Sequence, residues 1–239
     1  MEDYYQSIIR SRDALAKRVD ELFKKSNYKL LLSLQDYNLL EDADNCIATS
    51  TVIGYVIEEY IVSHLVGGCR ASDCEPFKVK RRSGATTKDS YDCWFENDAV
   101  RFLVNVKAEK EGGSNDAVAA IKQLYNDYCE SEPDVEKSYI VIKAKYKISE
   151  VEISDGQYQR CIEVTGVDAY CLEEIELVAD AGGFSQDHRN WSVGGNNLNN
   201  GRLRISSAFR RKHRLTSERV SYSNTKTIIS EIFCYNNKE

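Results

Sequence analysis

The sequence is poor in the features that divide a chain into separate units. Only two of its 239 residues are proline, and no low-complexity tract offers an obvious linker. A chain of this length can bury a substantial core. We therefore expect a single domain over residues 1–239.

Long apolar runs are missing as well. No apolar segment reaches the roughly 18 residues that a membrane helix needs. The first segment, MEDYYQSIIRSRDALAKR, is charged and amphipathic and lacks the apolar core of a signal peptide. These absences predict a cytoplasmic protein with no membrane partner. In a reducing cytoplasm, the eight cysteines are expected to be mostly buried apolar residues or idle thiols.

The spacing of apolar residues predicts an α/β fold in which a mixed β-sheet is flanked by helices. Helical spacing covers residues 3–25, 28–41, about 49–65, about 115–129 and 224–235. Strand patterns cover about 77–81, 90–96, 99–107, 138–148 and 158–165, and a turn at 96–98 joins two of them into a hairpin.

The hairpin carries the most informative residues of the chain. Asp92 lies in its first strand, and Lys107 ends its second strand two residues after Asn105. Residues 105 and 107 have the same side-chain parity, so their side chains lie on the same face of the sheet. Many nucleases use an aspartate facing an x-Lys pair to hold a divalent metal against a phosphate. The leading hypothesis is therefore phosphodiester hydrolysis, in which Lys107 holds the attacking water and offsets negative charge.

A further acid is expected from the helix over residues 49–65. Glu58 stands in the segment GYVIEEYI, where apolar residues surround it at helical spacing. A carboxylate in such a place costs desolvation energy unless a cation compensates it, which makes Glu58 the best candidate. Glu59, one residue further round the helix, is the alternative.

This order of residues resembles the PD-(D/E)xK nuclease superfamily, in particular the type II restriction endonucleases that cut to blunt ends. The segment GYVIEEYI is similar to the family's G-x-x-apolar-Glu helix and places the family's acid at Glu58. Asp92 matches the family's first metal-binding aspartate, and Lys107 matches its catalytic lysine. The resemblance covers about residues 49–146. It implies a restriction-endonuclease-like core that uses Mg²⁺ and hydrolyses double-stranded DNA at a specific, palindromic site.

The resemblance also implies an assignment of regions and metal ligands. Asp92 would be the principal Mg²⁺ ligand, assisted by Asn105 and the carbonyl of Val106. A palindrome is best read by a two-fold symmetric protein, so a homodimer is expected. Four regions follow. Residues 1–45 form a helical part with a candidate dimer contact, and residues 46–165 form the catalytic core. Residues 180–219 form a DNA-recognition and phosphate-contact region, and residues 220–239 form a C-terminal helix.

Asn105 departs from the family pattern, because NVK stands where D-x-K or E-x-K is usual. One interpretation is that Asn105 binds the metal through its amide oxygen. A second is that Glu109, which has the same parity as Lys107, supplies the missing negative charge. A third is that the chain is an inactive form.

Residues 201–219 form a basic segment in a chain whose formal net charge is −6, with seven arginine or lysine residues against one acid. Contact with DNA phosphates requires a positively charged surface, and this segment is positive although the whole chain is negative. Asparagine amides in the preceding Gly-Asn segment can pair with adenine in the major groove. A second basic stretch, with Lys80 and Arg81, and a predicted helix N-terminus at Ser114 are further candidates for contact with DNA. The predicted DNA contacts are therefore Asn196, Asn197, Asn199, Asn200, Arg202, Arg204, Arg210, Arg211, Lys212, Arg214, Lys80, Arg81 and Ser114.

Two other functions remain open from the sequence. One is a repair or junction-resolving nuclease with the same core. The other is a sequence-specific DNA-binding protein whose cleavage is lost at Asn105. Metal binding without strand scission would favour the second. A purely structural role for the basic segment would require that neutralising residues 201–219 leave DNA affinity unchanged.

Overall fold

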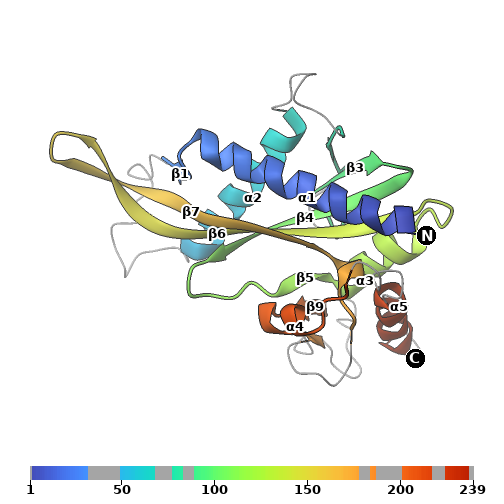
Figure 1. The fold of residues 1–239 in the computed structure, drawn as a ribbon. Helices are drawn as coiled ribbons and strands as arrows, with labels where there is room; N and C mark the ends of the chain where they lie inside the picture. The colour runs from blue at the N-terminus through green and yellow to red at the C-terminus, as the bar shows by residue number, and fades with distance from the viewer. Residues whose placement is uncertain are drawn as a thin grey trace.

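The computed structural model describes residues 2–31, 49–67, 77–82, 89–177, 184–186, 201–216 and 224–236. These residues form a mixed α/β fold built on a six-stranded sheet with helices on both faces (Figure 1). The predicted fold class, a mixed sheet flanked by helices, is therefore confirmed. Among the described residues, no helix is both long enough and apolar enough to span a membrane.

The main sheet has the strand order β1-β7-β6-β4-β3-β2. Its central pair, β4 and β6, is parallel, and every other neighbouring pair is antiparallel. The strands are β1 (Lys29–Leu30), β2 (Lys80–Arg81), β3 (Cys93–Asn97), β4 (Val100–Lys110), β6 (Lys137–Ser154) and β7 (Gln157–Cys171). A smaller antiparallel sheet has the order β5-β9-β8, with β5 (Ala117–Ala120), β9 (Arg202–Ile205) and β8 (Phe184–Gln186).

The helices are divided between the two faces of the main sheet (Figure 1). On one face lie α1 (Glu2–Lys25) and α2 (Thr49–Gly67). On the other lie the smaller sheet and the helical elements α3 (Ile121–Leu124), α4 (Ser207–Lys212) and α5 (Thr225–Asn236). A π-helical turn, η3 (Tyr125–Glu130), follows α3, and a 3₁₀ turn, η4 (Leu172–Glu174), follows β7.

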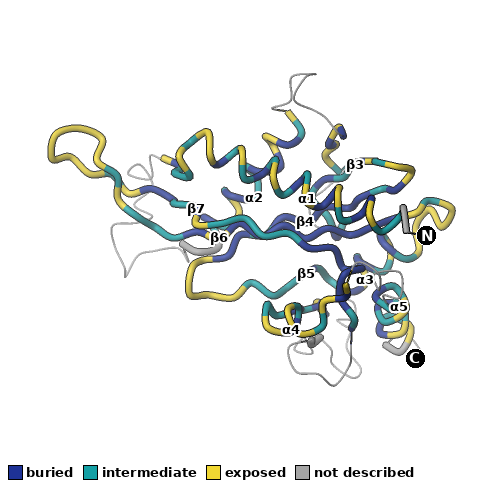
Figure 2. Tube along the Cα trace, viewed as in Figure 1, coloured by how far each residue is buried: buried dark blue, intermediate teal, exposed yellow. Residues whose placement is uncertain are grey.

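Each face of the sheet has its own hydrophobic core, because successive side chains of a strand point to opposite faces. Along β4, Phe102, Val104 and Val106 pack in the core under α1 and α2, whereas Leu103 packs in the core under α3 and α5. Asn105 and Lys107 therefore face the side of the smaller sheet. The far end of the β6–β7 hairpin extends beyond both cores and is exposed (Figure 2).

Several elements agree with the sequence predictions. The helices over 3–25, 49–65 and 224–235, the β3–β4 hairpin and the long strands β6 and β7 are all present. The hairpin turn falls at Asp98 and Ala99, whereas the predicted turn covered residues 96–98. Both residues adopt left-handed conformations, with φ of 49° and 63°. Two consecutive residues with positive φ are typical of the tight turns that join antiparallel strands.

Two predicted helices are wrong in part. The prediction of helix over residues 28–41, within the expected helical region 1–45, fails at its start. There Tyr28 has φ of 59°, and β1 extends the sheet beside β7. Residues 32–41 lie outside the described residues. The helix predicted over 115–129 begins only at Ile121, because residues 117–120 form β5 and pair with β9. Ser114 is consequently not at a helix N-terminus.

Candidate active site

A cleft of about 1090 Å³ lies between the main sheet, the middle of α2 and β5. Its lining brings together four of the predicted catalytic residues, which come from α2, from the residue before β3 and from β4: Glu58, Asp92, Asn105 and Lys107. Residues separated by nearly 50 positions in the sequence thus share one site. Ser114 lines the same cleft.

The two carboxylates sit at an unpaired edge of β4. Pairing between β3 and β4 ends at Cys93 and Val104, and the amide of Asp92 donates to the carbonyl of Val104 at 2.8 Å. Beyond that point the Val106 amide donates to Oδ2 of Asp92 at 2.8 Å, and the Ala108 amide donates to Oε1 of Glu58 at 3.1 Å. The carboxylates thus take the place of a neighbouring strand.

The same edge carries the carbonyl of Val106. The N–H and C=O groups of one strand residue point to the same side of the strand. Because the Val106 N–H faces Asp92, its carbonyl faces that carboxylate as well. This orientation agrees with the role as an oxygen ligand that the resemblance implies for Val106.

The structure distinguishes Glu58 from Glu59. Burial raises the pKa of Glu58, and Asp92 adds to this rise, while Lys107 and the Ala108 N–H act in the opposite direction. Glu59 instead forms an exposed ion pair with Arg81 at 2.7 Å, and Arg81 holds the pKa of Glu59 below its ordinary value. Glu58 is therefore the helix acid that belongs to the cleft.

Asn105 is almost completely buried, with 4 % of its surface exposed. Its amide nitrogen Nδ2 lies within hydrogen-bond distance of three acceptors, which share its two hydrogens: the Ser90 carbonyl at 2.6 Å, the Val118 carbonyl at 3.0 Å and the Tyr139 hydroxyl at 3.0 Å. Its oxygen Oδ1 is buried and has no hydrogen-bond partner among the described residues. An unpaired amide oxygen in a polar cleft is a group that a cation can satisfy.

Glu109, the alternative source of negative charge, has other partners. Its Oε2 accepts a hydrogen bond from the backbone N–H of Asn115 at 3.1 Å. The same oxygen lies 3.2 Å from Nζ of Lys143, which is buried on the neighbouring strand β6. Burial acts to raise the pKa of Glu109, but these two partners outweigh it, so the pKa lies below its ordinary value. Glu109 does not line the cleft.

The predicted DNA contacts have different surroundings. Arg202 is exposed and lines the cleft, and Arg211 and Lys212 are exposed on α4. Three others pair with acids, Arg81 with Glu59, Arg210 with Asp168 and Arg214 with Glu174. Lys80 lies over the ring of Trp94, 4.3 Å from its centre, and Arg204 belongs to β9. Asn196, Asn197, Asn199 and Asn200 lie outside the described residues.

Some cleft residues were not predicted as site residues. Arg82 and Lys110 add two cations to the cleft, and Gln123 adds an amide. Arg82 belongs to the same basic stretch as Lys80, which was the available signal for it. Nothing in the sequence indicated a role for Tyr139 in the site, because it lies within the apolar run of a predicted buried strand. Its hydroxyl donates to the Ser90 carbonyl and accepts from Asn105.

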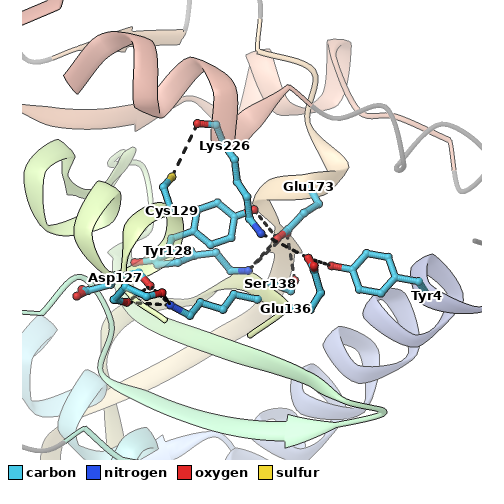
Figure 3. Close-up of polar contacts among 11 residues, drawn as sticks. Tyr4, Asp127, Tyr128, Cys129, Glu136, Ser138, Glu173 and Lys226 are labelled. Carbon is cyan, nitrogen blue, oxygen red and sulfur yellow. Dashed lines mark hydrogen bonds and ion pairs between the residues drawn. The ribbon is translucent and has the colours of Figure 1, made fainter. Parts of the chain in front are cut away.

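A buried carboxylate supports the strand that carries Tyr139. Glu173 accepts hydrogen bonds from the Tyr128 hydroxyl at 2.6 Å and the Ser138 hydroxyl at 3.1 Å (Figure 3). It also accepts from the backbone amide of Tyr139 at 3.1 Å. No cation contacts Glu173 within the described part of the chain. Lys226 points toward this group but pairs with Glu136 at 3.4 Å. Burial raises the pKa of Glu173, against the smaller opposing effects of Tyr128, Lys226 and Ser138.

This raised pKa predicts how Glu173→Gln changes the pH dependence of stability. Protonated Glu173 contributes stability that is present below its unfolded-state pKa and is lost as pH rises through its folded-state pKa. Each unit between the two pKa values corresponds to about 1.4 kcal/mol. Urea denaturation from pH 4 to pH 8 should therefore show the wild type losing stability relative to Glu173→Gln as pH rises. A constant difference between the two proteins across this range would contradict the raised pKa.

The cleft residues fit a divalent cation that prefers oxygen ligands. No three His, Cys, Asp or Glu side chains in the described ranges form a metal-binding group on their own. The cleft instead offers the carboxylates of Asp92 and Glu58 and the unpaired oxygen of Asn105. The carbonyl of Val106 lies on the same edge of β4 as these carboxylates. Mg²⁺ binds through few protein oxygens and keeps several waters, so this set suits it. Neither a protein-family model nor a curated protein matches the sequence.

Proposed function

We propose that this protein is a Mg²⁺-dependent endonuclease of the PD-(D/E)xK type that hydrolyses double-stranded DNA, and specifically a type II restriction endonuclease. The observation that carries the proposal is the convergence of Asp92, Asn105, Lys107 and Glu58 on one cleft. Four cations line the same cleft and suit a polyanionic substrate: Arg82, Lys107, Lys110 and Arg202. The proposal includes a cytoplasmic homodimer acting at a palindromic site.

In this mechanism, Asp92, Asn105 and the Val106 carbonyl would hold Mg²⁺. When bound, Mg²⁺ neutralises charge on the scissile phosphate and acidifies a bound water. Lys107 holds and orients the attacking water and offsets the negative charge that develops on the phosphate. Glu58 keeps the edge of β4 in place by accepting a hydrogen bond from the Ala108 amide, and it lies close to Lys107. Arg82, Lys110 and Arg202 contact the DNA backbone.

The direct test is incubation of the full-length protein with plasmid and phage DNA, with and without Mg²⁺, followed by gel electrophoresis. Discrete fragments that require Mg²⁺ are expected from a site-specific enzyme. Non-specific degradation or cutting of branched DNA alone would instead identify a repair or junction-resolving nuclease. Intact DNA that is still retarded in a binding gel would show a DNA-binding protein that does not cleave.

Arg202→Ala is expected to weaken DNA binding and to reduce its salt dependence. Each phosphate contact adds about 0.9 to the slope of log K against log salt concentration, so losing one should lower the slope by about one unit. The affinity should be measured by fluorescence anisotropy over a salt series in Ca²⁺. Lys17→Ala is the control, because Lys17 is exposed on α1, on the opposite face of the sheet. Equal slopes for the wild type and Arg202→Ala would exclude a phosphate contact at Arg202.

A further inference from the structure

The three hydrogen-bond partners of Asn105 come from separate parts of the fold. Ser90 precedes β3, Val118 belongs to β5 and Tyr139 belongs to β6. Two of these partners are backbone carbonyls, which accept hydrogen bonds and never donate them. The group that faces them must therefore be a donor. This fixes the orientation of the Asn105 amide, with Nδ2 toward the carbonyls and Oδ1 away from them.

We infer that the fold selects an amide over a carboxylate at position 105. A carboxylate there would place an acceptor oxygen where Nδ2 now lies, 2.6 Å from the Ser90 carbonyl and 3.0 Å from the Val118 carbonyl. The Tyr139 hydroxyl could turn its proton toward that oxygen, but the Ser90 carbonyl would then lose both of its donors. Buried acceptors without donors are strongly unfavourable.

This inference bears on the departure from the D-x-K pattern. Asn105 is the residue that its surroundings require, rather than a replacement that damages a site built for an acid. Ser90, Val118 and Tyr139 act as positioning residues that leave Oδ1, the single acceptor atom of the amide, without a hydrogen-bond partner among the described residues. The consequence for metal binding rests on the proposed function, whereas the preference for an amide does not.

The test compares the melting temperatures of four full-length proteins in EDTA. Asn105→Asp exchanges the donor for an acceptor, and Asn105→Ala removes the donor without adding an acceptor. Asn97→Asp is the matched control, because Nδ2 of Asn97 donates to the hydroxyl of Ser11 at 2.9 Å. A hydroxyl can turn to donate to a carboxylate, so this control should melt within roughly 2 °C of the wild type.

Asn105→Asp is expected to melt roughly 5–10 °C below the wild type, with Asn105→Ala between the two. If Asn105→Asp cannot be recovered in a folded form while the other two variants fold, it is the least stable of the four proteins, which also agrees with the inference. The inference is overturned if Asn105→Asp melts at or above Asn105→Ala. The consequence for metal binding is overturned if Asn105→Asp binds Ca²⁺ more tightly than the wild type in calorimetry. A wild type that shows no Mg²⁺-dependent cleavage would refute the proposed function and leave the melting comparison unaffected.

Discussion

Lys107→Ala is expected to abolish Mg²⁺-dependent DNA cleavage while leaving DNA binding in place. Lys107 is half-buried, lines the cleft and lies close enough to Glu58 to oppose the rise in its pKa. A cation in this position acts on the charge that develops during the reaction, and losing such a group costs roughly 100-fold or more in rate. The rate should be measured as the conversion of supercoiled plasmid to nicked and linear forms.

The appropriate control for this variant is Lys110→Ala. Lys110 lies on the same strand and lines the same cleft, but it is exposed at the end of β4. Its loss should weaken DNA binding without removing cleavage at saturating protein. If Lys107→Ala cleaves as fast as the wild type, Lys107 has no part in the chemistry. The proposed reaction would then require another cation.

Arg12→Ala is expected to lower the free energy of unfolding by about 3 kcal/mol and the melting temperature by roughly 6–12 °C. The Arg12 Nη1 donates to both carboxylate oxygens of Glu174, at 2.7 and 2.8 Å. Both side chains are buried, with 7 % and 2 % of their surfaces exposed. Removing the arginine would leave a buried carboxylate whose remaining partners, among the described residues, are Arg214 and the backbone amide of Cys171.

Chemical denaturation with urea measures this loss, and Arg10→Ala is the matched control. Arg10 is on the same helix and is exposed. Its replacement should change the stability by no more than about 0.5 kcal/mol. Replacing Arg12 and Glu174 together by apolar residues should recover much of the loss, because no buried charge remains without a partner. A single-variant effect as small as that of Arg10→Ala would show that this ion pair does not stabilise the fold.

The sequence predicted the parts of the fold that depend on local pattern. Helical spacing in α1 and α2 and the hairpin of β3 and β4 are properties of short segments, and the alternation of side chains along a strand put Asn105 and Lys107 on the same face of β4. The strand β5 could not be predicted in this way. Its sequence has helical spacing, and it is a strand because it pairs with β9, more than 80 residues later in the chain.

The partners of individual side chains were also beyond the sequence. Glu109 has the parity of Lys107, but it pairs with Lys143 because β4 and β6 lie side by side in parallel register. The donor requirement at Asn105 likewise arises from two carbonyls that only the folded chain brings together. A sequence motif states which residue types are present. Tertiary contacts decide which atoms of those residues remain available to a substrate.

The attachment of the N-terminal segment has a consequence for the order of folding during synthesis. Helix α1 packs against β7, β1 pairs with β7, and Arg12 reaches Glu174 after the end of that strand. The packing of α1 against β7 can therefore form only after about 170 of these residues have been made, whereas α2 and the β3–β4 hairpin are available to α1 earlier. Until then α2 can cover part of the apolar face of α1, but the part that packs on β7 stays exposed while most of these residues are being synthesised.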